Sequence, residues 1–443
     1  MSQSYVVLYV RPTDDSTLTM SRKPKVILAV HGGAGIIQRE SLTPELEREY
    51  CDALKVALRS GFDVLNRKID DNELSSANVA VDAAEAAVKS LENCPLFNAG
   101  RGSVFASDGK IRMDASIMGC YLDNVSTRCK ETDDGQEVNK TKITSPRQII
   151  QERKYPIQPH PRAGAVAGVS NIQNPIMLAR QVMERTPHVM LIGKGAEDFA
   201  KTLPPEVGVK FQPDGYFCTE RRWTQLEDVR EMESRQKQGK DNVMMFQLDH
   251  ASAPSTAVTI ERGASKECEP KYEHDSHKFG TVGSVALYQP DPKSNGPHRA
   301  QLASATSTGG MTNQRYHRVG DSPVIGAGTY ANSLCAVSCT GHGEWFIRCV
   351  AAHDVAKRLE YKYSDYQDRG SALEKAVDEV VNGSLRGDDE NGGGAGGLIA
   401  LDRDGNFYAD MNCSGMYHAW LYENGDMETR IFSDKKKNVK IAE

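Results

Sequence analysis

The sequence of 443 residues contains no apolar run that approaches the length of a membrane-spanning helix. Its first 24 residues, Met1 to Pro24, lack the basic segment followed by an apolar segment that marks a secretory signal. We therefore expect neither an integral membrane protein nor a secreted protein, and we place the chain in the cytoplasm.

Ten cysteines are present, but none stands in a Cys-x-x-Cys pair or in the Cys/His spacing of a zinc site. Without a secretory signal, reduced thiols are the expectation. The formal net charge is -6, with acidic and basic residues interspersed. Nothing in this balance favours a nucleic acid or an anionic membrane as a partner.

The sequence lacks the motifs of two common kinds of site, a phosphate-binding loop and a histidine-based catalytic triad. The stretch His31 to Gly35 (HGGAG) follows an apolar strand, but no Gly-Lys-Ser/Thr comes after it, which argues against a phosphate loop. His31, His317 and His342 lie in or beside glycine-rich loops without a Gly-x-Ser-x-Gly, so a histidine-based triad is not favoured. The glycines after His31 would instead let the backbone approach a ligand or another loop closely.

At this length the chain could hold two or three average domains, but one large α/β unit is also possible, and we place such a unit at residues 25–443. An apolar run at 26–30 predicts a buried strand, and Thr43-Pro44 predicts a helix N-terminus. Further helices are expected at 76–92, 176–184 and 344–359, with strands at 189–192, 398–401 and 407–411.

Two polar stretches interrupt this pattern, at residues 120–161 and 201–279. We interpret both as insertion or linker segments, since neither can supply a core. Within the second stretch, the charged run from Trp223 to Lys240 is compatible with a surface helix.

The most informative stretch runs from Gly280 to Asp321. Two β-rich segments, 282–287 and 301–308, flank a Pro/Asn/Gly-rich loop and predict a β-hairpin with a long connection. Thr281 follows a glycine at the head of the first strand. A threonine in this position is usually an ordinary strand residue, but as a new chain terminus it would carry a general base in its own α-amine.

Nine segments, in one order along the chain, resemble the plant-type L-asparaginase / isoaspartyl peptidase family, whose members are N-terminal-nucleophile hydrolases. They are residues 31–35, 91–100, 163–169, 187–200, 280–287, 305–313, 318–331, 338–344 and 415–417. The resemblance implies a four-layer αββα sandwich. It also implies self-cleavage between Gly280 and Thr281 into chains 1–280 and 281–443.

The same resemblance implies the roles of the site residues. Thr281 would be the nucleophile and Thr308 would tune it, while Asn98 would orient groups nearby. Thr340 and Gly341 would form the oxyanion hole, where fixed donors meet developing negative charge. Arg318 would bind the α-carboxylate of a substrate and Asp321 its α-ammonium, because a guanidinium fits a carboxylate bidentately; Gly343 would line this pocket.

The resemblance implies a structural sodium ion, held by a loop through its backbone carbonyls. The matching positions are Leu91, Glu92, Cys94, Phe97, Ala99 and Arg101. Carbonyl oxygens suit such a hard cation, although an ordinary tight loop would have the same sequence. The catalytic chemistry implied by the family requires no cofactor.

The expected activity is hydrolysis of L-asparagine and β-aspartyl dipeptides, with release of L-aspartate. Alternatives are a glycosylasparaginase, a taspase-like protease, or an uncleaved, non-catalytic binding scaffold. The pair Arg318 and Asp321 demands a free amino acid end, which disfavours an endopeptidase. By resemblance we expect a dimer of processed αβ heterodimers. One departure from the family pattern, Asn412-Cys413-Ser414 before Gly415, could alter which substrates fit.

Overall fold

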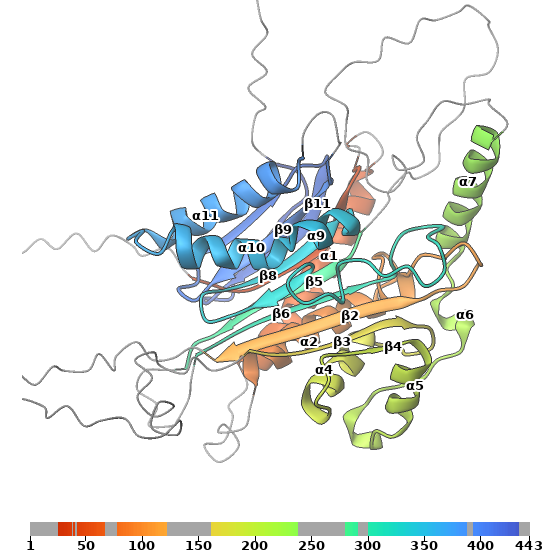
Figure 1. The fold of residues 1–443 in the computed structure, drawn as a ribbon, viewed down its shortest axis with the longest axis horizontal. Helices are drawn as coiled ribbons and strands as arrows, with labels where there is room; N and C mark the ends of the chain where they lie inside the picture. Colours follow the sequence, from red (N-terminus) through yellow and green to blue (C-terminus); the bar gives the residue numbers. More distant parts are fainter. Residues whose placement is uncertain are drawn as a thin grey trace, which may run out of the picture.

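The computed structural model describes residues 25–37, 39, 42–66, 78–121, 161–237, 280–290, 300–387 and 393–433 (Figure 1). The predictions for Met1 to Pro24, for nearly all of 120–161 and for 238–279 lie outside these residues. The described part combines two β-sheets with helices, so it is a mixed α/β protein.

The larger sheet has eight strands in the order β12-β11-β1-β5-β6-β2-β3-β4. Along the chain these strands are β1 (Val26–Gly35), β2 (Met113–Tyr121), β3 (Arg162–Val169), β4 (Met190–Ile192), β5 (Val282–Tyr288), β6 (Gln301–Thr308), β11 (Gly415–Tyr422) and β12 (Met427–Arg430). The smaller sheet has the order β10-β9-β8-β7. Its strands are β7 (Thr329–Ala331), β8 (Cys335–Gly341), β9 (Gly396–Asp402) and β10 (Phe407–Met411).

The helices are mostly short, and two of the turns are π-helical. The helices are α1 (Pro44–Leu65), α2 (Val79–Asn93), α4 (Pro175–Arg185), α5 (Gly193–Lys201), α6 (Asp214–Phe217), α7 (Glu220–Lys237), α9 (Gly343–Cys349), α10 (Ala351–Lys357) and α11 (Arg369–Glu379). The short turns are η2 (Gly100–Gly102), η3 (Pro205–Val207), η4 (Arg358–Lys362) and η5 (Val380–Ser384), of which the last two are π-helical.

These elements pack in layers around three clusters of buried apolar side chains. Helices α1, α2 and α4 pack on one face of the larger sheet, and α10 and α11 pack on the smaller sheet (Figure 1). The third cluster lies between the two sheets, where Val285 and Leu302 meet Ile399 and Leu401. Strand β5 is therefore covered on both faces, which explains why all of its residues from Val282 to Leu287 are buried.

The predicted hairpin is confirmed. Strands β5 and β6 pair antiparallel, with Val282 opposite Ser307 and Tyr288 opposite Gln301. The predicted helix start at Thr43 is confirmed as well, because the Thr43 hydroxyl accepts a hydrogen bond from the Leu46 amide at 3.2 Å. Strand β1 runs further than predicted, through Gly35, because its last residues continue to pair with β11, with Gly35 opposite Gly415.

The single helix expected at 344–359 is wrong, since the chain forms α9 and α10 with a break at Val350. Val350 has φ 49° and ψ 48°, a left-handed conformation that is rare for a β-branched residue. After the break, the amides of Ala352 and His353 donate to the carbonyls of Ala327 and Gly326. The break thus turns the first amides of α10 towards the loop that follows Asp321.

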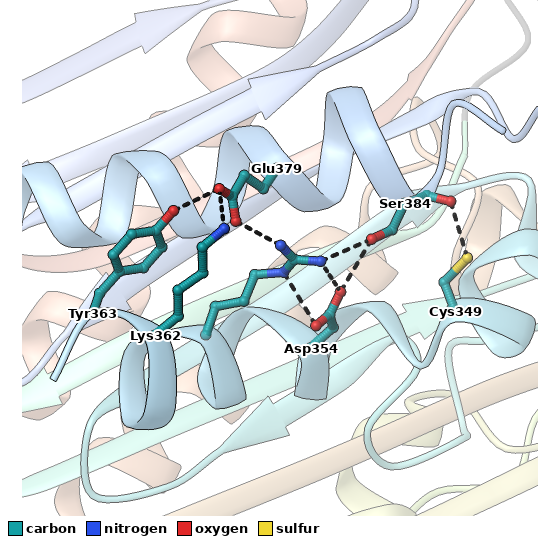
Figure 2. Close-up of polar contacts among 7 residues, drawn as sticks. Cys349, Asp354, Lys362, Tyr363, Glu379 and Ser384 are labelled. Carbon is teal, nitrogen blue, oxygen red and sulfur yellow. Dashed lines mark hydrogen bonds and ion pairs between the residues drawn. The ribbon is translucent and has the colours of Figure 1, made fainter. Parts of the chain in front are cut away.

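A polar network joins α10 and η4 to α11 and η5 (Figure 2). Arg358 donates to both carboxylate oxygens of Asp354, at 3.1 and 2.9 Å, and to Glu379 at 2.5 Å. Lys362 and the Tyr363 hydroxyl also donate to Glu379. The network holds the two helical segments together on the outer side of the smaller sheet.

Residues 201–237 fold against the body, whereas the sequence interpretation treats all of 201–279 as insertion or linker. In α7, the side chains of Arg222 and Leu226 are buried, and Arg222 donates from Nε to the Gly102 carbonyl at 2.8 Å. Further along the helix, Arg230 donates to the Ser107 carbonyl. The helix expected within Trp223 to Lys240 is confirmed, but one face of it is buried.

Candidate active site

The hairpin brings two of the predicted site threonines to one end of the larger sheet. Val282 pairs with Ser307 in this antiparallel hairpin. Thr281, which precedes β5, and Thr308, which ends β6, therefore lie next to each other at one end of the sheet. Both side chains are buried, with 6% of Thr281 and 3% of Thr308 exposed. The Thr308 hydroxyl accepts a hydrogen bond from the Gly310 amide at 3.0 Å, which fixes the turn after β6.

The glycine-rich end of β1 packs directly on Gly280. A Cβ added to Gly33, whose φ is 113°, would lie 2.7 Å from both the nitrogen and the oxygen of Gly280. A Cβ added to Gly280 would lie 2.7 Å from the hydroxyl oxygen of Thr340. The same hydroxyl accepts a hydrogen bond from the Ala34 amide at 3.1 Å. The glycines therefore permit a backbone-to-backbone approach that brings Thr340 beside the residue before Thr281.

The hydroxyl of Thr281 has a partner that the sequence did not reveal. Its Oγ1 lies 3.2 Å from Oγ of Ser322, a side chain that is 1% exposed. The Ser322 carbonyl in turn accepts from the hydroxyls of Ser116, at 2.6 Å, and Thr329, at 3.3 Å. A serine in front of a proline is typical of a turn, so no pattern marked Ser322 as a site residue.

Further buried hydroxyls continue this network away from Thr281. Thr329 contacts Thr306, which lies 2.8 Å from Ser338. Ser338 lies 2.9 Å from Nε2 of His31. Burial lowers the pKa of His31 to about 3, although a backbone contact with Thr281 acts in the opposite direction. His31 is thus a neutral member of a hydrogen-bonded network.

Asn98 contacts the turn after Thr308 from the side of α2. Its amide nitrogen donates to the Gly310 carbonyl at 2.7 Å, and its amide oxygen accepts from Val104 at 3.0 Å. The Gly309 amide donates to the Asn98 carbonyl. Asn98 therefore holds the Thr308-Gly309-Gly310 turn in place from a buried position.

The predicted charge pair converges on Gly343. A Cβ added to Gly343 would lie 2.8 Å from Nη2 of Arg318 and 2.9 Å from Oδ1 of Asp321. The structure thus brings all three residues to one point. Ser322, which contacts Thr281, immediately follows Asp321 in the chain. A ligand bound to both Arg318 and Asp321 would therefore lie close to Thr281 in space, because Ser322 adjoins Asp321 and contacts Thr281.

Arg318 also has a carboxylate partner that no sequence motif marks. Its Nε and Nη2 donate to the two carboxylate oxygens of Glu344, each at 2.9 Å, in a bidentate ion pair. Burial alone would raise the pKa of Glu344, but the hydrogen bonds and charge of Arg318 lower it to about 2. Glu344 belongs to the segment 338–344 that resembles the family, but its place in the sequence does not predict an ion pair with Arg318.

Asp321 is a buried carboxyl without full hydrogen bonding. Only 3% of it is exposed, and its Oδ2 has no hydrogen-bond partner among the described residues. Burial raises the pKa of Asp321 to about 7, although the charge of Arg318 lowers it. A buried acceptor with a spare oxygen suits a cationic ligand group, which would favour its ionised form.

A second buried carboxyl, Asp114, contacts the loop that carries Arg318 and Asp321. Its Oδ1 accepts from the Gly168 amide at 2.8 Å, and it also receives a backbone hydrogen bond from Gly320. Burial raises the pKa of Asp114 to about 6. Asp114 therefore links strands β2 and β3 to the loop that carries Arg318 and Asp321.

The loop at 91–101 has the tight backbone that a carbonyl-lined ion site requires. A Cβ added to Gly100 would lie 2.2 Å from the Glu92 carbonyl oxygen, and one added to Gly102 would lie 2.0 Å from that of Phe97. A side chain at Gly100 or Gly102 would therefore clash with these backbone oxygens, so glycine is required for the close approach. Among the described residues, no group of three or more His, Cys, Asp and Glu side chains is placed to bind a metal ion. Any ion here would be bound by the backbone.

Comparison with known protein families identifies the family to which the chain belongs. A sequence model of the family described as Asparaginase matches residues 24–129 and 159–431. The chain therefore belongs to this asparaginase family. The match is interrupted at 130–158, within the stretch interpreted from the sequence as an insertion.

Several curated relatives are similar over nearly their whole length. An Escherichia coli protein named isoaspartyl peptidase is 37% identical, over 94% of this chain and 98% of its own. A rat protein named isoaspartyl peptidase/L-asparaginase is 33% identical, over 92% of this chain and 89% of its own. A Thermococcus kodakarensis protein named plant-type L-asparaginase is 31% identical, over 90% and 97%. No helix in the described part of the chain is sufficiently long and apolar to cross a membrane.

Proposed function

We propose that this protein is a self-cleaving threonine hydrolase of L-asparagine and β-aspartyl dipeptides. The observation that carries the proposal is the convergence of Arg318, Asp321 and Gly343 beside the segment that contacts Thr281. Asparagine and β-aspartyl dipeptides share a free α-carboxylate, a free α-ammonium and a side-chain amide. The names of the similar proteins agree with this substrate class.

Maturation would begin with attack of the Thr281 hydroxyl oxygen on the Gly280 carbonyl carbon. The C–N bond of the peptide breaks, the acyl group moves to oxygen, and the Thr281 nitrogen gains a proton and becomes an amine. Water then hydrolyses the ester to give the carboxylate of Gly280 and a free Thr281. The position of Thr340 beside Gly280 supports this step, because its hydroxyl could stabilise the negative charge that develops on the carbonyl oxygen.

In the mature enzyme, the Thr281 α-amine would accept the hydroxyl proton as the oxygen attacks the side-chain carbonyl of the substrate. The Thr340 hydroxyl and the Gly341 amide would stabilise the oxyanion. Ammonia, or the amine of the second residue in a dipeptide, leaves with the proton. Water hydrolyses the aspartyl ester, which releases L-aspartate and restores Thr281. Thr308 and Asn98 would keep the turn beside the nucleophile fixed.

Substrate recognition would depend on charge. Arg318 would bind the α-carboxylate and Asp321 the α-ammonium, and the absence of a side chain at Gly343 would leave room between them. Because an endopeptidase substrate has neither free group, this pocket disfavours a taspase-like activity. A glycosylasparaginase would require space for a sugar on the side-chain nitrogen, which a substrate panel can test.

We further propose that the loop at 91–101 holds a sodium ion through carbonyls of Leu91, Glu92, Cys94, Phe97, Ala99 and Arg101. The close approach that Gly100 and Gly102 allow to two of these carbonyls supports this assignment. The ion would stabilise the loop that positions Asn98, and it would take no part in the bond-breaking steps.

Three broader features belong to the proposal. The two sheets and their outer helices support a four-layer αββα sandwich of the N-terminal-nucleophile hydrolase type. A cytoplasmic location agrees with the eight free cysteines of the described residues. A dimer of αβ heterodimers is expected from the family resemblance, and native mass spectrometry of the matured protein would test it.

The experiment is a substrate panel with purified, matured protein. L-asparagine and β-Asp-Leu should be hydrolysed, whereas Nα-acetylated asparagine, asparagine glycosylated on its side-chain nitrogen and an internal Asp-Gly peptide should not. Arg318→Lys should raise KM for asparagine, because an ammonium cannot bind a carboxylate bidentately. Activity on the glycosylated or internal substrates would favour one of the alternative hydrolases. Inactivity on every substrate would favour the binding scaffold.

A further inference from the structure

The guanidinium of Arg318 is held on two sides by residues of its own chain. Glu344 binds the edge formed by Nε and Nη2, with both bonds at 2.9 Å. On the other side, Nη1 donates to the Gln314 side-chain oxygen at 3.3 Å, and that oxygen also accepts from the Met311 amide. The side chain of Arg318 is 15% exposed, so these contacts define its orientation.

The remaining edge, between Nη1 and Nη2, is bordered by two glycines. A Cβ added to Gly320 would lie 2.9 Å from Nη1, and one added to Gly343 would lie 2.8 Å from Nη2. A side chain at either position would cover the guanidinium. The absence of both leaves this edge approachable by a ligand carboxylate, which needs two parallel N–H groups.

Asp321 and Asp114 are two further carboxyls whose charges act on Arg318, and Asp321 is the one that shares the approach to Gly343. The Cβ position of Gly343 lies within 3 Å of both the Arg318 and the Asp321 side chains. Even so, Oδ2 of Asp321 has no partner in the described part of the chain, and the ion pair of Arg318 is with Glu344. Without Glu344, a buried cation and a buried anion this close would be expected to pair with each other.

We propose that Glu344 is a specificity-determining positioning residue that keeps Arg318 and Asp321 apart, so that both charges remain available to a zwitterionic substrate. Glu344 neutralises the charge of Arg318 and turns its Nη1–Nη2 edge towards Gly343. Its loss would let Arg318 pair with Asp321 and would close the α-carboxylate and α-ammonium subsites together. This inference rests on the proposed function, because it assumes a substrate with both groups.

The test compares wild-type protein with Glu344→Gln. The amide keeps the size of the side chain but loses its charge and one of its two acceptors. We expect KM for asparagine to rise by roughly tenfold or more, with kcat per free Thr281 N-terminus largely unchanged. The inhibition constant of L-aspartate, which carries both charged groups, should rise by a similar factor. A merely structural role would lower thermal stability or kcat without this selective loss of binding.

Glu360→Gln is the matched control, since Glu360 pairs with Lys357 on the outer helices and should leave both constants unchanged. Should Glu344→Gln fail to mature, Glu344→Asp replaces it, because the shorter carboxylate keeps the charge but cannot span the same fork. An unchanged KM and an unchanged aspartate inhibition constant in a folded, cleaved variant would overturn the inference. Failure of the wild-type protein to hydrolyse asparagine would instead overturn the proposed function itself.

Discussion

The hydroxyl oxygens of Thr281 and Ser322 lie 3.2 Å apart, and both side chains are buried. The backbone of Ser322 is fixed in position, because its carbonyl accepts hydrogen bonds from the hydroxyls of Ser116 and Thr329. A fixed hydroxyl beside a nucleophile restricts the rotation of the threonine and keeps its oxygen in one direction. Ser322 therefore connects the strand that begins after Thr281 to the loop that carries Asp321.

Replacement of Ser322 by alanine should slow both self-cleavage and hydrolysis. The loss of one neutral hydrogen bond to the nucleophile is expected to cost about 1 kcal/mol, or roughly a factor of five in rate. Ser322→Thr, which keeps the hydroxyl, serves as the control. Time courses of fragment formation and kcat for asparagine would measure the effect. Unchanged rates in Ser322→Ala would remove Ser322 from the site.

Asp321 should give the enzyme a distinct pH dependence. With a pKa of about 7, its carboxyl is largely neutral below that pH and cannot pair with an α-ammonium. Accordingly, kcat/KM for asparagine should fall as the pH drops through about 7. The Thr281 α-amine, which ordinarily titrates near 7.7–8.0, adds a second loss in the same direction.

The comparison uses pH profiles of kcat/KM for wild-type protein and Asp321→Asn. The variant should lose roughly two orders of magnitude of kcat/KM and one of the two ionisations in its acidic limb. Asp198→Asn, at an exposed surface pair, is the control. An Asp321→Asn variant with the wild-type slope and activity would contradict the assigned role.

Glu92 should make stability depend on pH in the opposite sense. Its carboxyl accepts from Ser307 at 2.7 Å and from the Ile176 amide at 3.0 Å, and burial raises its pKa from an ordinary 4.5 to about 8. The folded chain therefore retains a proton that the unfolded chain loses above about pH 4.5. The contribution of the protonated form is complete below that pH, and it is lost as the pH rises towards and through 8.

Glu92→Gln, which resembles the protonated acid, removes this dependence. Between pH 5 and pH 8 the wild-type protein should lose stability relative to the variant. The loss in its free energy of unfolding should be at most about 1.4 kcal/mol per pH unit. Urea unfolding of both proteins at several pH values gives the difference in stability. A constant difference across the range would mean that Glu92 is ionised in the folded protein.

The Arg358 network should contribute measurably to stability (Figure 2). Arg358→Ala would leave Asp354 and Glu379 without their shared partner, at a cost of about 1–3 kcal/mol. Arg369→Ala breaks an exposed pair with Asp404 and should cost less than about 1 kcal/mol. The relevant side-chain exposures are 23% for Arg358 and 51% for Arg369. Equal effects in denaturant titrations would show that the network adds nothing beyond surface pairing.

The sequence predicted those parts of the fold that depend on local patterns. The β5–β6 hairpin followed from apolar runs around a polar loop, and the start of α1 followed from Thr43-Pro44. The break at Val350 could not be predicted, because it depends on contacts between α10 and the loop at 326–327. The buried face of α7 was also hidden, since its charged residues, including Arg222, find partners only in the folded chain.

The candidate site divides in the same way. Thr281, Arg318 and Asp321 could be assigned because they stand in recognisable motifs. Ser322, Glu344 and Asp114 could not, because each acts through a neighbour that is distant in sequence or through a backbone amide. Side chains that position others leave no periodic signature, and only the three-dimensional arrangement identifies them.

The most direct test of the account is intact-mass measurement with N-terminal sequencing of purified wild-type protein and Thr281→Ala. We expect a wild-type fragment that begins at Thr281, absent from the variant, together with asparagine hydrolysis that depends on this fragment. A full-length wild-type chain that hydrolyses asparagine without cleavage, or a Thr281→Ala variant that is cleaved at the same bond, would contradict it.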